Sequence, residues 1–385
     1  MEITRFTDTA PGDLQKNLDG NWTFVPHSLP GQVVWTDRLV SAIGEAESAL
    51  GRLSGLGKKF PRPKRLVRLF LRREAEFSSR IENTYAGVQT QLLFQVMPEI
   101  KETAPDVQEV ENNFRALEFG IKSIQQGRPI STGLIRQMHA ILLRDVRGHD
   151  KTPGEYRRIQ AHIGRSSDIR TARFVPVPPH SIVDCMDQLA TFIASDQTMP
   201  RVARLAMMHY QFEAIHPFAD GNGRIGRVLI MLMMLQTDML PLPILNPSAY
   251  LEAHRAEYYD HLLEISERGT WAEWIEFFSL GITQECKDTS RRLEAMETLR
   301  QSYQEKVRTT RSSAKLTKFV DELFGRPRVR LEDVAKMLDV WPASAQRFID
   351  RLVELDILRE MTGERRNRVY LAHKIVDQFS RQGAE

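Results

Sequence analysis

Residues 216–227 read His216-Pro-Phe-Ala-Asp-Gly-Asn-Gly-Arg-Ile-Gly-Arg227, and this stretch separates two segments with helical character. Residues 201–214 are predicted to form the first helix, which Pro217 and Gly221 interrupt. The second helix, from about residue 224 to 236, is almost wholly apolar, and such a helix is normally buried. The polar residues of the loop are therefore expected at the opening turn of a buried helix.

That opening turn suits a phosphate group. Free backbone N–H groups and the positive end of the helix dipole converge there. Gly221 and Gly223 allow the backbone to approach an anion closely. Arg224 and Arg227 are three residues apart, so both project from the same side of the first turn and can clamp phosphate oxygens.

Two further groups of the loop point to catalysis. Asp220 is suited to Mg²⁺, which prefers one carboxylate together with water and phosphate oxygens. His216 can take a proton from an attacking hydroxyl. Each of these residues has an ordinary structural explanation when it stands alone, but their combination within one short loop favours a phosphate-handling site.

Composition limits the alternatives. The chain has 385 residues, 42% of them hydrophobic, which predicts two or three domains with a large core. A formal net charge of +3 does not by itself indicate nucleic-acid binding. The ten histidines show no paired ligand spacing, so a zinc hydrolase is disfavoured. Two cysteines, no visible secretory signal and no apolar run longer than eight residues make the cytoplasm the expected location.

Three blocks follow one another along the chain. Residues 1–62 begin irregularly and then contain a predicted helix at 36–53, followed by a loop at 55–61. Residues 63–300 are mostly helical. Within them, residues 157–179 form two alternating runs around a polar tip, which predicts a β-hairpin, with a plain loop as the alternative. The charge-dense residues 285–308 are expected to form a solvated connecting helix.

The last block, residues 311–380, has the pattern of a winged helix-turn-helix. Three short helices are predicted at 314–324, 331–338 and 342–355, and a hairpin at 358–371 would form the wing. Basic residues exceed acidic ones by only three between residues 311 and 371, although Arg365, Arg366 and Arg368 cluster at the predicted wing tip. DNA contact and a role in dimerisation or protein docking therefore stay open.

The segment at 216–227 resembles the signature of the Fic family, His-x-Phe-x-Asp/Glu-Gly-Asn-Gly-Arg-x-x-Arg, at every defined position. The resemblance extends from about residue 15 to 285 and includes Lys16–Trp22. It implies a mainly α fold, with a Fic-type helical core, a small β-hairpin flap and, at the carboxy terminus, the winged helix. It also implies transfer of AMP from ATP to a serine, threonine or tyrosine hydroxyl of a target protein, which could be the enzyme itself.

The resemblance assigns a role to each motif residue. His216 would be the general base, Phe218 would fix the loop in the core, and Asp220 would hold Mg²⁺. Asn222 and the neighbouring glycine backbone would hold phosphate oxygens, and Arg224 and Arg227 would grip the β- and γ-phosphates. The nucleotide-binding residues that the resemblance implies are Glu82, Ala161, His162, Ile163, Gly164, Asp220, Gly221, Asn222, Gly223, Arg224, Ile225, Gly226, Arg227, Tyr258 and Tyr259.

Two of these groups lie outside the motif. Residues 161–164 belong to the predicted hairpin, the family's flap, which would hold the target segment as an added strand. Tyr258 and Tyr259 lie where family members line the adenine pocket, although two tyrosines on a helix are as often part of a core.

Ser78, Glu82 and Asn83 match the family's inhibitory motif, Ser/Thr-x-x-x-Glu-Gly/Asn, in the class whose inhibitory helix precedes the catalytic core. The resemblance implies that Glu82 pairs with Arg227 and keeps the γ-phosphate from binding there. The same site in some relatives removes AMP instead. A third reading is a DNA-binding regulator whose core only senses nucleotide, but sensing alone needs no base such as His216. Homodimer formation also stays open.

Overall fold

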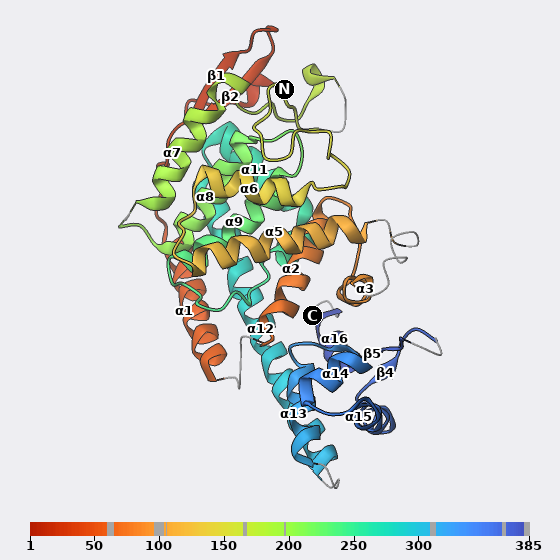
Figure 1. Cartoon of the computed structure of the whole chain (residues 1–385). Helices are drawn as coiled ribbons and strands as arrows, with labels where there is room; N and C mark the ends of the chain where they lie inside the picture. Colours follow the sequence, from red (N-terminus) through yellow and green to blue (C-terminus); the bar gives the residue numbers. More distant parts are fainter. Residues whose placement is uncertain are drawn as a thin grey trace.

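The computed structural model describes residues 1–59, 65–95, 104, 106–164, 168–195, 198–308, 313–363 and 367–380. Helices dominate these residues, and the strands are short (Figure 1), so the predicted mainly α fold is confirmed. Among the described helices, none combines the length and the apolar character needed to cross a bilayer.

The first two blocks of the sequence form one helical body with a small hairpin at its end. Its elements are η1 (Ile3–Arg5), β1 (Gly12–Lys16), β2 (Trp22–Pro26), α1 (Asp37–Lys59), α2 (Val67–Ile81), α3 (Val88–Phe94), α5 (Val107–Gln125), α6 (Thr132–Leu142), η3 (Ile169–Thr171), η4 (Pro179–Ser181), α7 (Ile182–Ala194), α8 (Arg201–Ile215), α9 (Asn222–Gln236), α10 (Pro247–Ala253), α11 (Arg255–Arg268) and α12 (Trp271–Arg308).

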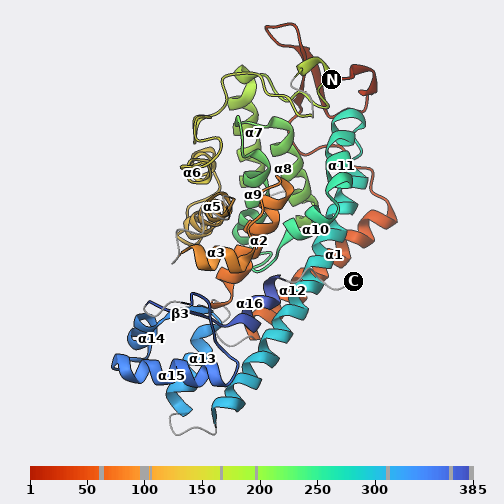
Figure 2. The same cartoon turned by 90° about the vertical axis from the view of Figure 1, so that its right-hand side faces the viewer.

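Helix α9 lies at the centre of this body. It contacts α2, α5, α6, α8 and α10, and the views in Figures 1 and 2 agree on this central place. Every side chain from Val228 to Met234 is buried. An all-apolar helix is stable only where neighbours cover all of its faces, so the position of α9 confirms the burial expected from its sequence. The loop at 216–221 is consequently anchored to the most constrained helix of the fold.

The N-terminal block contains a hairpin that the sequence did not predict. β1 and β2 pair antiparallel, from Gly12 opposite Pro26 to Lys16 opposite Trp22. The turn between them contains Gly20 with a positive φ of 78°, a conformation that glycine adopts without strain. Phe24 is fully buried and donates its backbone N–H to the carbonyl of Val175 at 2.9 Å. The hairpin therefore braces the segment that leads out of the predicted flap.

The predicted flap is less regular than a hairpin of two strands. Among its described residues, the pairing is one antiparallel bridge between Ile163 and Phe174. The prolines at 176, 178 and 179 have no N–H to donate to a ladder. Gln160 compensates, because its side-chain amide donates to the carbonyls of Ala161 and Pro176. Residues 165–167 of the predicted polar tip lie outside the described part of the chain.

Two other expectations about local structure were wrong. The predicted loop at 55–61 is helical as far as Lys59, where α1 ends, and residues 60–61 lie outside the described part. α1 runs along α12 and this packing outweighs the low helix propensity of Gly55 and Gly57. The charge-dense residues 285–308 belong to α12, but they are not simply solvated, since Cys286, Leu293, Met296, Tyr303 and Val307 are buried.

The last block forms a separate small unit at the far end of α12 (Figure 2). Its elements are α13 (Ser313–Leu323), β3 (Arg328–Arg330), α14 (Leu331–Leu338), α15 (Pro342–Glu354), β4 (Arg359–Glu360), β5 (Val369–Leu371) and α16 (His373–Ser380). The strands form an antiparallel sheet in the order β3-β5-β4. The three helices lie where they were predicted, and assignment of the unit as a winged helix remains a prediction. Arg365 and Arg366 of the predicted wing tip lie outside the described residues.

Helix α16 packs this unit against the helical body that the first two blocks form. It packs against α2, α3 and α12. Phe379 on α16 meets Phe70 on α2 edge to face, with ring centroids 4.9 Å apart. The guanidinium of Arg73 donates to the carbonyl of Phe379, and that of Arg292 donates to the carbonyl of Gln378. Helix α16 is thus fixed on the helix that leads to Glu82.

Candidate active site

The loop between α8 and α9 is held in one shape by its own backbone and by Asn222. His216 ends α8 with φ 50°, and Gly221 precedes α9 with φ 76°, so both lie in the left-handed region. The side-chain amide of Asn222 accepts from the N–H of Phe218 and donates to the carbonyl of the same residue, at 2.9 and 2.8 Å. Both ends of this amide therefore bind the loop. The group that residue 222 would offer to a phosphate is its backbone N–H.

His139 on α6 packs against the loop and supports it. The sequence analysis did not identify this residue. Its ring stacks on Phe218, with centroids 3.8 Å apart and planes 6° apart. Nδ1 accepts from the N–H of Gly154 at 2.8 Å, so the ring proton is on Nε2, which donates to the carbonyl of Asp220 at 2.9 Å. Burial, together with the charge of Arg224, lowers the pKa of His139 to about 4. A neutral ring therefore fixes the backbone carbonyl of Asp220.

Arg157 clamps the loop from the side of the flap. Its backbone N–H donates to Pro217, and Nε of its guanidinium donates to the carbonyl of His216, both at 2.9 Å. The same guanidinium also donates to the carbonyls of Ile159 and Val177 in the flap segment. One buried cation thus joins the loop at 216–221 to the flap segment.

His216 itself is in the state required of a base. Burial and the neighbouring charge of Arg157 lower its pKa to about 4, so the imidazole is neutral at pH 7. A hydrogen bond with the backbone of Glu213 acts to raise this pKa, but burial outweighs it. A neutral imidazole has one unprotonated nitrogen, which can accept a proton from a hydroxyl brought next to it.

Arg227 is occupied by the helix α2 and the turn that follows it. Its Nε donates to Oγ of Ser78 at 3.0 Å, and its Nη2 donates to the carbonyl of Ser78 and to Oε1 of Glu82, both at 2.8 Å. Burial raises the pKa of Glu82, but the attraction and hydrogen bond of Arg227 outweigh it, so the pKa lies below its usual range. The contact between Glu82 and Arg227 is therefore an ion pair of two charged groups at neutral pH.

Glycine at position 223 is required for this ion pair. A Cβ atom there would lie 2.4 Å from Oε1 of Glu82 and 2.8 Å from Nη1 of Arg227. Asn83, the third residue of the predicted inhibitory motif, has φ 60° and accepts from Nη1 of Arg255 at 2.8 Å. All three predicted inhibitory residues thus lie at the opening turn of α9 or connect it to α11.

Arg224 and Asp220 lie on the other side of the same turn. Arg224 is buried and pairs with both Glu109 of α5 and Asp220 at 3.4 Å. Asp220 is one-third exposed, and its Oδ1 also accepts from the N–H of Gly221 at 2.6 Å. In the described part of the chain, no group of three His, Cys, Asp or Glu residues could form an all-protein metal cage. A single carboxylate fits Mg²⁺, which takes its other ligands from phosphate and water.

A cavity of about 1050 Å³ opens beside the loop and unites residues from four segments of the chain. The predicted site residues that line it are Glu82, Asn83, Ile163, Gly164, His216, Gly223, Arg227, Tyr258 and Tyr259. The volume is sufficient for a nucleotide. The cavity brings the predicted base His216, the carboxylate of Glu82, one of the two arginines and the two tyrosines into one space.

The other predicted site residues do not line this cavity. Ser78, Ala161, His162, Asp220, Gly221, Asn222, Arg224, Ile225 and Gly226 are absent from its walls. Ile225 is a core residue with no exposed surface. Gly226 allows α8 and α9 to approach, because a Cβ there would lie 2.1 Å from Oε1 of Glu213. Contact of residues 225 and 226 with the nucleotide stays a prediction, which only their backbone could fulfil.

Tyr258 and Tyr259 differ in their surroundings. Tyr258 is buried, and its hydroxyl pairs with Nε2 of His209 at 2.8 Å. Tyr259 lies beside it, with ring centroids 5.1 Å apart, and Arg255 stacks over its outer face. Tyr258 thus belongs both to the core and to the cavity wall, and contact of the two tyrosines with adenine stays a prediction.

Glu213 is a further residue of this cavity that the sequence did not identify. Burial raises the pKa of its carboxyl group to about 8, so the group is mostly protonated at pH 7. Its Oε1 is buried without a hydrogen-bond partner among the described residues. The acid lies one helical turn before His216, and no motif of the sequence analysis includes it.

The role of His139 leads to a prediction about acid stability. Because its folded pKa of about 4 lies below the ordinary value, its contribution to stability is complete above pH 6.5 and is lost as the pH falls toward 4. His139→Phe keeps the stack on Phe218 but removes both hydrogen bonds. We expect urea unfolding at pH 7 to show a loss on the order of 2 kcal/mol.

The same variant should lose less stability than the wild type between pH 7 and pH 5, by on the order of 1–2 kcal/mol. His180→Phe, at an exposed histidine, is the control and should change neither quantity. An unaltered pH dependence in His139→Phe would contradict the neutral, buried state assigned to this ring.

Two family models match the chain over the parts that build this site. Residues 129–234 match the Fic/DOC family, and residues 40–122 match the Fic/DOC family N-terminal region. The first match contains the whole loop and α9 as far as residue 234, and the second contains the helix that bears Ser78. The chain belongs to the Fic/DOC family.

Relatives named as protein adenylyltransferases share part of this region. A probable protein adenylyltransferase of Aquifex aeolicus is 30% identical over 123 residues, which are 31% of this chain and 38% of the relative. The protein adenylyltransferase fic-1 of Caenorhabditis briggsae is 29% identical over 134 residues, 34% of this chain and 25% of the relative. The matches thus span well under half the length of these relatives.

Solved structures show that the fold is shared more widely. A Fic family protein from Desulfovibrio desulfuricans G20 matches with a TM-score of 0.57 at 20% identity, over 89% of this chain and 98% of its own. Fic-1 of Caenorhabditis elegans matches with a TM-score of 0.51 at 20% identity, over 68% of this chain and 73% of its own. Both likenesses concern the fold alone.

Proposed function

We propose that this protein transfers AMP from ATP to a hydroxyl group of a serine, threonine or tyrosine in a target protein. The observation that carries the proposal is a neutral His216 that lines one cavity together with Arg227 and the opening turn of α9. Relatives named as protein adenylyltransferases support the same reaction. The target and the choice among the three hydroxyl residues belong to the proposal.

In the proposed reaction, the hydroxyl oxygen attacks the α-phosphorus of ATP. A new P–O bond joins AMP to the protein, the bond between the α-phosphorus and the α–β bridging oxygen breaks, and pyrophosphate leaves. His216 takes the hydroxyl proton. The N–H groups at the start of α9 and the guanidiniums of Arg224 and Arg227 hold the phosphate oxygens and offset the charge that develops. Such a transfer depends mainly on positioning and electrostatic stabilisation.

Asp220 would hold Mg²⁺, which neutralises charge on phosphate oxygens when it is bound. The protein's own contribution is to keep this carboxylate still. Its backbone carbonyl is fixed by His139 and its Oδ1 by the N–H of Gly221 and the guanidinium of Arg224.

The same contacts support autoinhibition. While Glu82 and Ser78 occupy the guanidinium of Arg227, that guanidinium is not free to bind a γ-phosphate. ATP bound without this contact would have its phosphates displaced, and the α-phosphorus would not lie in line with the attacking hydroxyl. We therefore propose that the described conformation is the resting one, and that activation separates Glu82 from Arg227.

The test of the reaction uses ATP labelled either at the α- or at the γ-phosphate, incubated with the Glu82→Gly variant and a cell lysate. AMP transfer puts label on protein from α-labelled ATP and none from γ-labelled ATP. Identification of the labelled protein by mass spectrometry would give the target. Label transferred only from the γ-position would replace this proposal with phosphoryl transfer.

Removal of AMP from a modified protein is the second candidate, because Glu82 and His216 line the same cavity. A carboxylate there can position a water molecule for attack on a phosphodiester. A target already carrying labelled AMP would then lose the label on incubation with the wild type in the absence of ATP. Loss of label at the same rate with Glu82→Gly would exclude this role for Glu82.

A further inference from the structure

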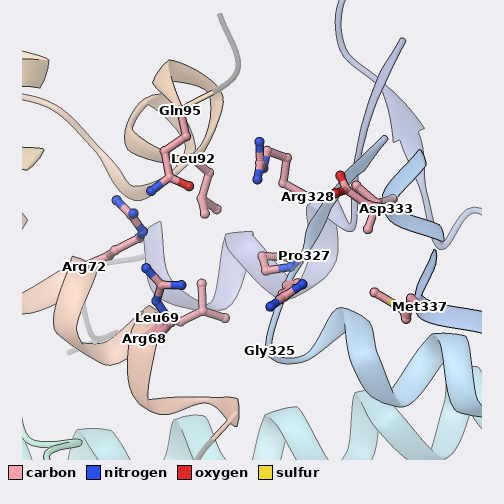
Figure 3. Close-up of a pocket in the computed structure, with 12 residues that line it drawn as sticks. Arg68, Leu69, Arg72, Leu92, Gln95, Gly325, Pro327, Arg328, Asp333 and Met337 are labelled. Atoms are coloured by element: carbon pink, nitrogen blue, oxygen red, sulfur yellow. The ribbon is translucent and has the colours of Figure 1, made fainter. Parts of the chain in front are cut away.

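A second cavity lies between the catalytic part and the C-terminal unit, well away from the loop at 216–227. It has a volume of about 160 Å³. One wall consists of α2 and the end of α3, and the other of β3, the segment before it and α14 (Figure 3). The same α2 ends beside Glu82, and α16 fixes the C-terminal unit on it.

Positive charge dominates the walls of this cavity. Four arginines and one carboxylate line it, namely Arg68, Arg72, Arg326, Arg328 and Asp333. Figure 3 shows Arg68 and Arg72 on the side of α2, with Arg328 reaching toward them from β3.

The arginines of α2 are held in place by the protein. Arg72 is buried, donates to Glu111 at 2.8 Å and to Gln91 at 3.2 Å, and stacks on Phe114 at 4.1 Å. Arg68 pairs with Glu118 at 3.1 Å on the exposed rim. Glu118 and Glu111 thus balance the charges of Arg68 and Arg72 on α2. The arginines of the opposite wall have no equivalent ion pairs among the described residues.

The opposite wall carries charge that is less well balanced. Within the described residues, neither Arg326 nor Arg328 forms a salt bridge, and the carboxylate of Asp333 accepts from the backbone N–H of Arg330 at 2.9 Å. Partial burial lowers the pKa of Arg328, and Asp333 acts against this effect. Repulsion from Arg330, from Arg72 across the cavity and from Arg326 lowers the pKa further. Docking of the C-terminal unit thus brings like charges together across a small cavity.

The rest of the lining would strengthen the binding of an anion. Leu69, Leu92, Pro327 and Met337 contribute apolar surface, and electrostatic attraction is stronger where water is partly excluded. About 10–15 Å³ of such cavity space is enough for one water molecule, so the cavity has room for a phosphate group. Guanidiniums suit phosphate oxygens because they donate two parallel hydrogen bonds.

From the four guanidiniums, the apolar lining and the volume, we propose that this cavity binds a phosphate group, either as inorganic phosphate or as the end of a small phosphate monoester. The bound anion would bridge Arg72 of α2 and Arg328 of β3. It would thereby offset their repulsion and stabilise the docking of the C-terminal unit on the helix that leads to Glu82. The proposal does not depend on the proposed AMP transfer, because it concerns other residues and requires no catalysis.

The test measures binding of inorganic phosphate to the full-length protein by isothermal titration calorimetry at constant ionic strength. Arg224→Ala serves as the background throughout, so that the loop before α9 does not contribute binding. We expect saturable binding with a stoichiometry near one, and a rise in melting temperature with phosphate concentration. Replacing phosphate with chloride should give neither effect. Absence of saturable binding would overturn the proposal.

The decisive variants remove charge from the wall that contains Arg326 and Arg328, which form no salt bridge within the described residues. Arg326→Gln together with Arg328→Gln should weaken phosphate binding by roughly tenfold or more, since each charge-assisted contact is worth about that much. Arg326→Gln alone changes an exposed side chain and keeps the test valid if the double variant does not fold. Arg347→Gln, at an exposed position of α15, makes the same charge change elsewhere and should bind like the parent. Equal affinity in all variants would contradict the site.

A second arm distinguishes the two sources of the phosphate group. Phenyl phosphate carries the same dianion on a small ester. If it binds as tightly as inorganic phosphate and with the same dependence on Arg326, the ligand is a phosphate monoester. If only inorganic phosphate binds, the cavity takes the free ion.

Discussion

Replacing His216 with alanine is expected to lower the rate of AMP transfer by about 10²- to 10⁴-fold, the usual contribution of a general base. The substitution removes the neutral imidazole that accepts the hydroxyl proton, but it leaves the N–H groups of α9 and both arginines in place. Binding of ATP should therefore change by less than a factor of about three. Single-turnover transfer of label from α-labelled ATP, measured in a Glu82→Gly background, gives the rate.

The pH dependence of this rate provides an independent check. Because the pKa of His216 is about 4, the base stays deprotonated across the neutral range. The rate should then be insensitive to this group at pH 6–8 and fall only as the pH approaches 4. Arg224→Ala is the matched control, because it should weaken nucleotide binding without removing the base. Transfer that persists at the wild-type rate in His216→Ala would refute the assigned role.

Glu82→Gly is expected to raise automodification of the protein by roughly 10- to 100-fold, the range that corresponds to losing one charged hydrogen bond of about 1.5–3 kcal/mol. The variant releases Nη2 of Arg227 from the carboxylate at 2.8 Å, so that the guanidinium can bind the γ-phosphate. Incorporation of label from α-labelled ATP into the purified protein measures the effect.

A more conservative pair of variants separates charge from backbone effects. Glu82→Gln removes the charge but keeps the side-chain shape, and it should raise automodification less than Glu82→Gly. Glu257→Gln makes the same change at an exposed position of neighbouring α11 and should leave the rate unchanged. If both Glu82 variants transfer AMP as slowly as the wild type, Arg227 is not the group that limits the reaction.

The sequence was most informative at residues 216–236, where a buried helix directly follows the residues with a predicted chemical role. The all-apolar pattern after Arg224 correctly predicted a central helix, and the pairing of Glu82 with Arg227 followed from the inhibitory motif. The role of Asn222 was less well predicted, because its amide closes the loop through Phe218. A residue type suited to phosphate contact can equally satisfy the backbone next to it.

The residues that were missed are those brought to the site by distant segments. His139, Arg157 and Glu109 lie on different elements from the loop, and each contacts it through one or two atoms. Their spacing in the sequence contains no information about these contacts. The flap was only partly predicted for a different reason, since an alternating pattern does not reveal that prolines will prevent a regular ladder.

Docking of α16 on α2 determines where the protein can be divided. Phe70 and Phe379 have no exposed surface, and Arg73 and Arg292 reach the last turn of α16. A fragment that stops after α12 would leave Phe70 and Arg73 of α2, the helix that precedes Glu82, facing solvent together with Arg292 of α12. Truncation for crystallisation, or a bulky fusion directly after Ser380, therefore alters the surroundings of α2, and a shortened protein is a poor reference for the activity of the whole.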